Sequence, residues 1–316
     1  ALTHDDVEVV ALNDPFMNPE YMAYMLKYDS VHGKFPGTVE AYDGGLIVNG
    51  KKYPVFTSME VKDIPWASVG AEYICECTGK HLTKELCQGH IDAGAKHVIM
   101  GAPSKDDTPM FVCGVNLDKY TSDMTFVSNA SCTTNCLAPM ADTLNKTYPI
   151  VSGIMTTVHA YTGDQMILDG PQRKGDLRRA RAGAQNIVPN STGAAKAIGL
   201  VIPELNGKLI GSAQRVPVPT GSTTILVAVV KGKDVTKESI NAAMKAATSE
   251  SFGYNTEPIV SSDVIGMRYG SLFDATQTMV AKIDDDTYQV QVVSWYDNEN
   301  SYTSQMVRTI KYFAEL

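Results

Sequence analysis

The first half of the chain alternates short apolar runs with amphipathic stretches, and this alternation restricts the fold more than any other feature. The clearest unit is a strand-type run at 71–79 ("AEYICECTG"), a helical stretch at 82–94 and a second strand-type run at 96–103 ("KHVIMGAP"). Further apolar runs lie at 7–14 and 125–131. Because strands separated by helices pair in parallel, the pattern predicts an α/β fold with a doubly wound parallel sheet.

The second half has a different pattern, made of long β-type runs in which apolar and polar residues alternate. Such runs lie at 151–162, 209–219, 222–232 and 286–297. They predict a large, mostly antiparallel sheet with one face covered by helices. The polar, basic stretch between the first two runs, at 163–186, is predicted to be a long loop, and loops of this length are usually functional.

Length and composition limit the classes of protein to which the chain can belong. With 316 residues, two ordinary domains are expected. The net charge of −8 argues against nucleic acid or an anionic membrane as the main partner, and no apolar run reaches the roughly 20 residues of a membrane span. Six cysteines in so long a chain do not form a dense disulfide framework, so a cytoplasmic protein with reduced cysteines is expected.

The stretch "SNASCTTNC" (128–136) places a cysteine where an apolar strand enters a helix. Cys132 then lies in the first helical turn, where the helix dipole is expected to lower the pKa of a thiol. His159, in the β-type run at 151–162, would be a suitable base beside it. Spacing alone leaves coincidence open. A Cys132–Cys136 disulfide fits poorly on a helix, and no further ligands gather there for a metal site.

Basic and small polar residues suggest that the second half binds anions. Arg178, Arg179 and Arg181 lie in the long loop, and Arg215 lies between two β-type runs. The segment 191–193 (Ser-Thr-Gly) precedes a helical stretch, and a helix N-terminus attracts anions. These arginines are either a solvated face with a structural ion pair or, together with the thiol, a site for a small phosphorylated substrate.

Several motifs together resemble the phosphorylating glyceraldehyde-3-phosphate dehydrogenase family. They are "SNASCTTNCLAP", "TTVHAYT", "DLRRARAGAQNIVPNSTGAAKA", "IPELNGKL", "QRVPVPTG" and "SWYDNENSYT", and the similarity extends over essentially the whole chain. The resemblance implies a Rossmann-type NAD-binding domain at 1–131 and 298–316 and an α+β catalytic domain at 132–297. It also implies a cytoplasmic homotetramer that oxidises D-glyceraldehyde 3-phosphate to 1,3-bisphosphoglycerate in glycolysis, with NAD and inorganic phosphate.

The resemblance assigns a role to each matching residue. Cys132 corresponds to the nucleophile that forms a thiohemiacetal and then a thioester, and His159 corresponds to the base. The residues that match the two anion pockets, for the substrate phosphate and for the attacking phosphate, are Ser131, Thr133, Thr162, Arg179, Thr192, Gly193 and Arg215. Those that match the cofactor site are Asn13, Asp14, Thr78, Gly79, Asn298 and Tyr302. A carboxylate at position 14 favours NAD over NADP.

One departure from the family concerns the start of the chain. A dinucleotide-binding domain carries a glycine-rich loop about 20 residues before its acidic residue. Counting back from Asp14 passes residue 1, and no Gly-x-Gly-x-x-Gly occurs in the chain. We therefore expect a partial sequence of a longer protein, lacking the first strand and the glycine-rich loop, that binds NAD poorly. Micromolar or tighter binding in a calorimetric titration would contradict that expectation.

Other functions remain open at this level. The same chemistry on erythrose 4-phosphate, or with NADP, would use the same residues, and kinetics with both sugars separate these variants. A Cys–His acyltransferase or hydrolase would need no nicotinamide cofactor, whereas Asp14, Asn298 and Tyr302 favour one. A non-catalytic fragment of the enzyme is the remaining alternative.

Overall fold

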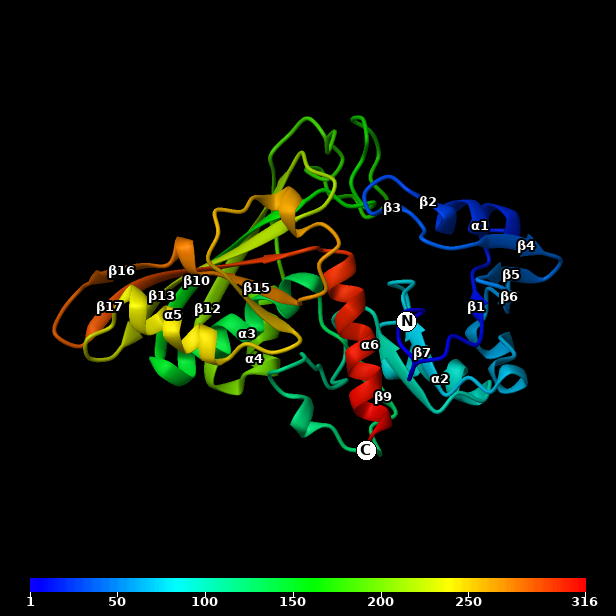
Figure 1. The fold of residues 1–316 in the computed structure, drawn as a ribbon, viewed down its shortest axis with the longest axis horizontal. Helices are drawn as coiled ribbons and strands as arrows, with labels where there is room; N and C mark the ends of the chain where they lie inside the picture. The colour runs from blue at the N-terminus through cyan, green and yellow to red at the C-terminus, as the bar shows by residue number, and fades with distance from the viewer. The chain divides into compact units, whose positions relative to one another are not determined.

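The computed structural model describes all 316 residues, which form two compact units. Unit 1 consists of Ala1–Met110, Tyr120–Asn129 and Met306–Leu316, and unit 2 consists of Phe111–Lys119 and Ala130–Gln305. Figure 1 shows the chain coloured from the N-terminus to the C-terminus. Two of the unit limits, at 129/130 and 305/306, lie near the predicted domain limits at 131/132 and 297/298.

Unit 1 contains short strands and two helices. The helices are α1 (Pro19–Lys27) and α2 (Lys84–Asp92). Each begins at a side-chain cap: the Asn18 side chain accepts the amide proton of Tyr21, and the Thr83 side chain accepts that of Leu86. The strands are β1 (Leu12–Asn13), β2 (Tyr28–Asp29), β3 (Gly33–Lys34), β4 (Val39–Tyr42), β5 (Gly45–Val48), β6 (Lys51–Phe56), β7 (Tyr73–Glu76), β8 (His97–Met100) and β9 (Phe126–Ser128).

The parallel pairing predicted for unit 1 is present, but the sheet is divided in two. One sheet has the order β7-β8-β9 and is parallel throughout, with α2 between its first two strands, as the alternation predicts. The other has the order β1-β6-β5-β4, in which only the β1–β6 pair is parallel. The expected strand at 7–14 is reduced to two residues, because only Leu12 and Asn13 pair with β6, while Val10 and Ala11 pack against the apolar cluster that includes Ile74 of β7.

Unit 2 is built on a large sheet with helices. Its helices are α3 (Cys132–Thr147), α4 (Ala194–Val201) and α5 (Lys237–Ala246), and α6 (Asn300–Ala314) begins here and ends in unit 1. Its strands are β10 (Ile150–Ala160), β11 (Val188–Ser191), β12 (Leu209–Val216), β13 (Ser222–Lys231), β14 (Phe252–Asn255), β15 (Ser271–Asp274), β16 (Met279–Lys282) and β17 (Thr287–Tyr296).

The large sheet confirms the prediction from period-two alternation. Its order is β11-β12-β10-β13-β17-β15-β14, with β16 paired to β17, and only the β10–β12 and β14–β15 pairs are parallel. Buried and half-buried residues alternate along β13, as expected for a strand with one covered face. The helix α3 packs on that face, with α4 and α5 beside it (Figure 1).

The stretch between β10 and β11 contains no helix or strand, which confirms the predicted long loop. The loop is held by local bonds, such as those from the amides of Met166 and Gly170 to the carbonyls of Arg179 and Ala180. No helix of the chain combines the length and the apolar character needed to cross a membrane.

Candidate functional site

A tight turn at the end of β9 presents Cys132 as the first residue of α3. Ala130 has a positive φ of 58°, and Ser131 is the N-cap, whose hydroxyl accepts the amide proton of Thr134 at 3.1 Å. The predicted helix start is therefore confirmed. Because the first turn of a helix has no carbonyl partners for its amides, it offers donors to an anion near the sulfur.

His159, near the end of β10, faces the thiol. Its Nε2 lies 3.6 Å from the Cys132 Sγ, and the ring is 5% exposed. Its Nδ1 lies 2.6 Å from the carbonyl oxygen of Ala160. Since a carbonyl only accepts, Nδ1 carries the proton and Nε2 has a lone pair directed at the sulfur. The histidine is thus oriented to take the thiol proton.

Burial keeps this pair neutral at rest. It raises the pKa of the Cys132 thiol, against the smaller opposing influence of Thr133 and Arg215. It lowers the pKa of His159 to about 4, with Arg215 and Arg179 adding to the effect. The expected lowering of the thiol pKa by the helix dipole is therefore wrong, because desolvation outweighs it. The thiolate forms only when the base takes its proton.

A row of hydroxyl groups lies behind the pair, and the sequence did not reveal it. The hydroxyl of the fully buried Tyr296 lies 2.9 Å from the Thr133 Oγ1 and 2.8 Å from the Thr157 Oγ1. Thr157 donates onward to the carbonyl of Thr223. The Tyr296 ring meets the His159 ring edge to face, with centroids 5.8 Å apart. Tyr296 therefore braces both the first turn of α3 and the histidine.

Arg215 lies beside His159 because β10 and β12 are parallel and these two residues are register partners. Its Nη1 donates to the Thr162 Oγ1 at 2.8 Å and to the Gln165 Oε1 at 3.4 Å, while its buried Nε has no hydrogen-bond partner. An arginine stays charged even though burial lowers its pKa. A half-buried cation with a buried, unpaired donor is suited to an anionic ligand.

Arg179, on the long loop, belongs to the same hydrogen-bond network as Arg215. It forms an ion pair with Asp164 through Nη1, and its Nε lies 3.4 Å from the Asp176 Oδ2. Asp164 also accepts the Thr162 hydroxyl at 2.5 Å. Thr162, Arg179 and Arg215 are thus joined in one network through Asp164, a carboxylate that the sequence did not single out. Its position two residues after Thr162 was the available signal.

The predicted second anion pocket lies at the start of α4. Gly193 is the N-cap residue, and the Thr192 Oγ1 accepts the amide proton of Ala194 at 3.2 Å. Asn190, on the preceding strand, donates to Asp176 at 3.3 Å and so ties this segment to the Arg179 loop. The helix α4, which these residues precede, packs beside α3, the helix that Cys132 begins.

Asn298 has a side chain whose orientation is fixed by its neighbours. Its Oδ1 accepts the hydroxyl protons of Thr220 at 3.0 Å and Ser222 at 3.2 Å. Ser222 in turn accepts the amide proton of Ala160, the residue after the histidine. The amide NH₂ of Asn298 is therefore the group presented to a ligand. Tyr302 donates to the carbonyl of Ala130 at 3.4 Å, which holds its ring beside the turn before Cys132.

The predicted cofactor residues of unit 1 lie in two turns that follow parallel strands. Asp14 follows β1 and binds the amide of Phe16 through one carboxylate oxygen, which leaves the other oxygen for ribose hydroxyls. Gly79 follows β7 with a φ of 69°, and the Lys80 Nζ lies 5.9 Å from the Phe16 ring centroid, so the turns are neighbours.

These residues fit the adenosine end of a dinucleotide, with one qualification of their roles. The Asn13 side chain is used within the protein, because it exchanges two hydrogen bonds with the backbone of Ser58, at 3.0 and 3.1 Å. Of these two neighbouring side chains, that of Asp14 is therefore the one available to a ligand.

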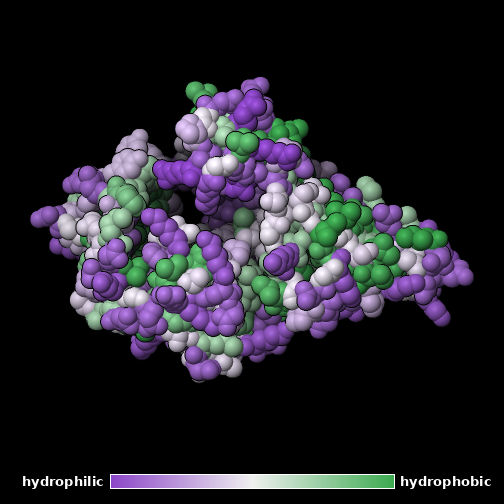
Figure 2. All heavy atoms as spheres, turned by 180° about the vertical axis from the view of Figure 1, so that it is seen from behind, coloured by the Kyte–Doolittle hydropathy of each residue, from purple (hydrophilic) through white to green (hydrophobic).

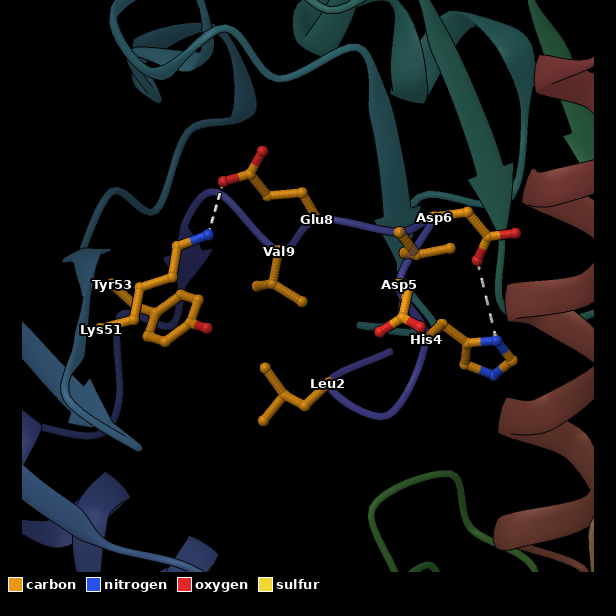
Figure 3. A pocket seen from close by; sticks show the side chains of 9 residues that line it. Leu2, His4, Asp5, Asp6, Glu8, Val9, Lys51 and Tyr53 are labelled. Carbon is orange, nitrogen blue, oxygen red and sulfur yellow. Dashed lines mark hydrogen bonds and ion pairs between the residues drawn. The ribbon is translucent and has the colours of Figure 1, made fainter.

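A cavity of about 490 Å³ in unit 1 lies apart from all these residues. The segment Leu2–Val9 and the side chains of Lys51 and Tyr53 line it (Figure 3). The Lys51 Nζ lies 2.5 Å from Glu8, and the His4 Nδ1 lies 4.0 Å from Asp6. No predicted site residue contributes to this cavity.

Comparisons with known proteins agree over the full length of the chain. The family model "Glyceraldehyde 3-phosphate dehydrogenase, NAD binding domain" matches residues 1–84, and "Glyceraldehyde 3-phosphate dehydrogenase, C-terminal domain" matches residues 131–298. The glyceraldehyde-3-phosphate dehydrogenase of Streptococcus pyogenes serotype M1 is 58% identical over 313 residues, which cover 99% of this chain and 92% of the relative. That of Clostridium pasteurianum is 54% identical over 310 residues, 98% of this chain and 92% of the relative.

Proposed function

This chain belongs to the glyceraldehyde-3-phosphate dehydrogenase family, and we propose that Cys132 and His159 carry out its chemistry. It is an NAD-dependent oxidoreductase of glycolysis that acts on glyceraldehyde 3-phosphate. The observation that carries the assignment of roles is the 3.6 Å approach of the Cys132 Sγ to the unprotonated Nε2 of His159. Two other cysteines, Cys87 and Cys136, donate instead to backbone carbonyls, those of His81 and Ser294.

The first step is addition of the thiol to the aldehyde. The Cys132 sulfur bonds to the carbonyl carbon, while His159 takes the thiol proton and delivers it to the carbonyl oxygen, giving a thiohemiacetal. His159 then accepts the hydroxyl proton as the carbon is oxidised. A thioester remains on Cys132, and the imidazole is protonated. The low pKa of His159, about 4, means that the base is free at neutral pH before each turnover.

Inorganic phosphate completes the cycle. A phosphate oxygen attacks the thioester carbon, the carbon–sulfur bond breaks, and the leaving thiolate recovers the proton from His159. The thioester retains the acyl-transfer energy that would be lost if water released the acyl group as a free acid. We assign Arg215 and Thr162 to the phosphate of the substrate, and the first turn of α3 (Ser131, Thr133) with Thr192 and Gly193 to the attacking phosphate, with Arg179 near both.

The cofactor supplies the hydride acceptor when it is bound. Asp14 would accept hydroxyl protons of the adenosine ribose, and the Thr78–Gly79 turn would contact the cofactor. The NH₂ of Asn298 would donate to the carboxamide of the nicotinamide, because its Oδ1 is already occupied by Thr220 and Ser222. Tyr302 would pack against the ring. These groups would orient the cofactor and take no proton.

The test is a spectrophotometric assay with glyceraldehyde 3-phosphate, NAD and phosphate. NADH absorbance should grow only when all three are present, and acyl phosphate should accumulate in equal amount. Rapid mixing without phosphate should give a burst of one NADH per site. NADH formation should then stop, because the thioester is not released from Cys132 without phosphate. Continuous turnover without phosphate would contradict the proposed thioester route.

We also propose that the protein works as a homotetramer. Side chains of Ile167, Leu168 and Leu177 in the long loop are 86%, 74% and 84% exposed, and Ile154 and Ile210 are exposed register partners on β10 and β12. Figure 2 shows apolar patches on the face that it presents. Clusters of this kind are typical of subunit interfaces. Light scattering should give four times the chain mass, and Ile154→Lys with Ile210→Asp should lower it.

The cytoplasm is the proposed location. All six cysteines are free, including two that are fully buried, which suits a reducing compartment. Fractionation of the source cells with an antibody to the protein tests this, and recovery with the secreted fraction alone would contradict it.

A further inference from the structure

Glu76, the last residue of β7, is a buried carboxylate that none of the steps above uses. It is 3% exposed and lies two residues before Thr78. Burial of a carboxylate is unfavourable unless hydrogen-bond donors replace water around its oxygens. Its partners therefore indicate why the chain keeps a charge at this position.

Three donors surround the Glu76 carboxylate. Its Oε1 accepts the backbone amide proton of Thr78 at 2.7 Å. Its Oε2 lies 3.0 Å from the His81 Nδ1 and 3.1 Å from the His90 Nε2. Burial alone would raise the pKa of Glu76, but the hydrogen bonds from His90 and Thr78 outweigh it and hold the pKa at about 2. Glu76 is therefore ionised.

The tautomer of His90 is fixed from its other side. The indole Nε1 of Trp66 lies 3.0 Å from the His90 Nδ1, and both side chains are buried. An indole nitrogen can only donate, so Nδ1 is unprotonated and the proton of the neutral ring is on Nε2, which faces Glu76. Trp66 thus donates to His90 and His90 donates to Glu76, whose other oxygen accepts the amide proton of Thr78.

The turn at the end of this chain has few other hydrogen bonds: the Thr78 Oγ1 lies 3.4 Å from the His81 Nδ1, and the Cys87 Sγ of α2 donates to the carbonyl of His81 at 3.3 Å. Gly79 adopts the left-handed conformation, with a φ of 69°, and Thr78 is exposed. Within the turn, the Thr78 Oγ1 accepts the amide proton of Lys80 at 3.1 Å. The bond to Glu76 joins the amide of Thr78 to the hydrogen-bonded side chains of His90, on α2, and of Trp66.

We propose that Glu76 is a positioning residue for the cofactor: held by His90 and Trp66, it fixes the Thr78–Gly79 turn in the shape that receives NAD. This inference rests on the proposed role of that turn in the cofactor site. Glu76 touches neither substrate nor the reacting atoms, so its loss should affect the use of NAD and leave the use of the aldehyde almost unchanged.

The variant Glu76→Gln tests the inference because it keeps the shape and removes one acceptor. With its oxygen toward Thr78, the new amide places an NH₂ against the His90 Nε2 proton. His90 cannot change tautomer while Trp66 donates to its Nδ1. We expect the KM for NAD to rise about tenfold, the effect of one lost charge-assisted hydrogen bond. The KM for glyceraldehyde 3-phosphate should change by less than about twofold.

The matched control is a second substitution that frees the histidine. In Glu76→Gln with Trp66→Phe, the His90 ring can move its proton to Nδ1 and accept the new NH₂ at Nε2. The KM for NAD of the double variant should therefore be close to that of Trp66→Phe alone. General loosening of the unit would not produce such a coupling between the two substitutions. Additive losses would overturn the inference.

A second pair of variants serves if Glu76→Gln does not fold. His90→Gln keeps a donor to Glu76 and an acceptor for Trp66, whereas His90→Leu removes both. The first should retain the KM for NAD, and the second should raise it by about tenfold or more. An equal KM in both variants would overturn the inference.

The cofactor role of the turn is checked separately with Thr78→Pro, which removes the amide that Glu76 binds. If this variant leaves the KM for NAD unchanged, the turn does not serve the cofactor and the proposed function of these residues is wrong. If it raises that KM while Glu76→Gln does not, the turn matters and only the positioning role of Glu76 is overturned.

Discussion

Two buried histidines, one in each unit, have opposite tautomers for reasons that can be read from a single neighbour. His159 in unit 2 and His90 in unit 1 are 5% and 3% exposed. The Nδ1 of His159 meets a carbonyl oxygen, that of Ala160, whereas the Nδ1 of His90 meets an N–H group, that of Trp66. The Nε2 of His159 therefore has a lone pair directed at its neighbour, whereas the Nε2 of His90 carries a proton.

This difference separates a catalytic base from a structural donor. The lone pair of His159 faces an acidic group, the Cys132 thiol, whose proton it can accept. The proton of His90 faces a carboxylate, Glu76, which only accepts. Burial and an adjacent acidic group are common to both sites, so neither of these identifies the base. The base is identified by the group that is hydrogen-bonded to its other ring nitrogen, Nδ1.

Replacement of the nucleophile should have the largest effect. Cys132→Ser replaces the sulfur with a hydroxyl, which is far less nucleophilic at neutral pH, and we expect kcat to fall by on the order of 10⁴ or more in the NADH assay. The matched control is Cys136→Ala, one turn along the same helix. Cys136 is fully buried, and burial raises its pKa to about 12, so this variant should keep kcat within about threefold. A Cys132→Ser enzyme with more than a tenth of the activity would contradict the mechanism.

Replacement of each histidine by glutamine tests the comparison directly. His159→Gln removes the lone pair that accepts the thiol proton, and kcat should fall by about 10² to 10⁴. Alkylation of Cys132 by iodoacetamide should slow in parallel. His90→Gln retains both of its hydrogen bonds, so kcat should stay near that of the unaltered protein. Similar losses of kcat in the two variants would show that the tautomer argument does not separate these residues.

The sequence predicted the elements of this site better than its contacts. The position of Cys132 at a helix start followed from the capping residues before it, and the long β-type runs predicted the sheet that carries His159. Tyr296 was missed because it lies at the end of an alternating strand, where an aromatic residue is typical of core packing. Its partner Thr133 is 163 residues away, and local patterns contain no information on such a contact.

The sequence also could not predict whether the pKa of the Cys132 thiol is raised or lowered. The position in the helix was correct, but the dipole is only one influence, and the degree of desolvation depends on the residues that the fold places around the sulfur. The divided sheet of unit 1 has a similar origin. The apolar run at 7–14 has the composition of a strand, yet strand formation needs a pairing partner, and only its last two residues before Asp14 pair with β6.

Loss of the half-buried cation, Arg215, should have a smaller effect, mainly on substrate binding. Arg215→Met removes the guanidinium donors and their charge from the anion pocket, and the KM for glyceraldehyde 3-phosphate should rise by about ten- to a hundredfold. Arg181→Met is the control, because Arg181 is exposed and pairs only with Asp169 at the surface. Equal changes in KM for the two variants would contradict the assignment of Arg215.

The smallest effect concerns the pKa of His159. Burial is the main reason that this pKa lies near 4 instead of 6.5, and the positive charge of Arg215 lowers it further. Arg215→Met should therefore raise the pKa of His159 by less than about one unit, measured by NMR titration of the ring.

The depressed pKa of His159 also makes the stability of the protein depend on pH. Because the folded pKa is depressed, the unfolded chain binds more protons between pH 6.5 and 4, so this residue makes the protein less stable as the pH falls through that window. The acid-induced loss should be smaller in Arg215→Met than in the unaltered protein, and a pKa that falls in the variant would contradict the proximity of the two side chains.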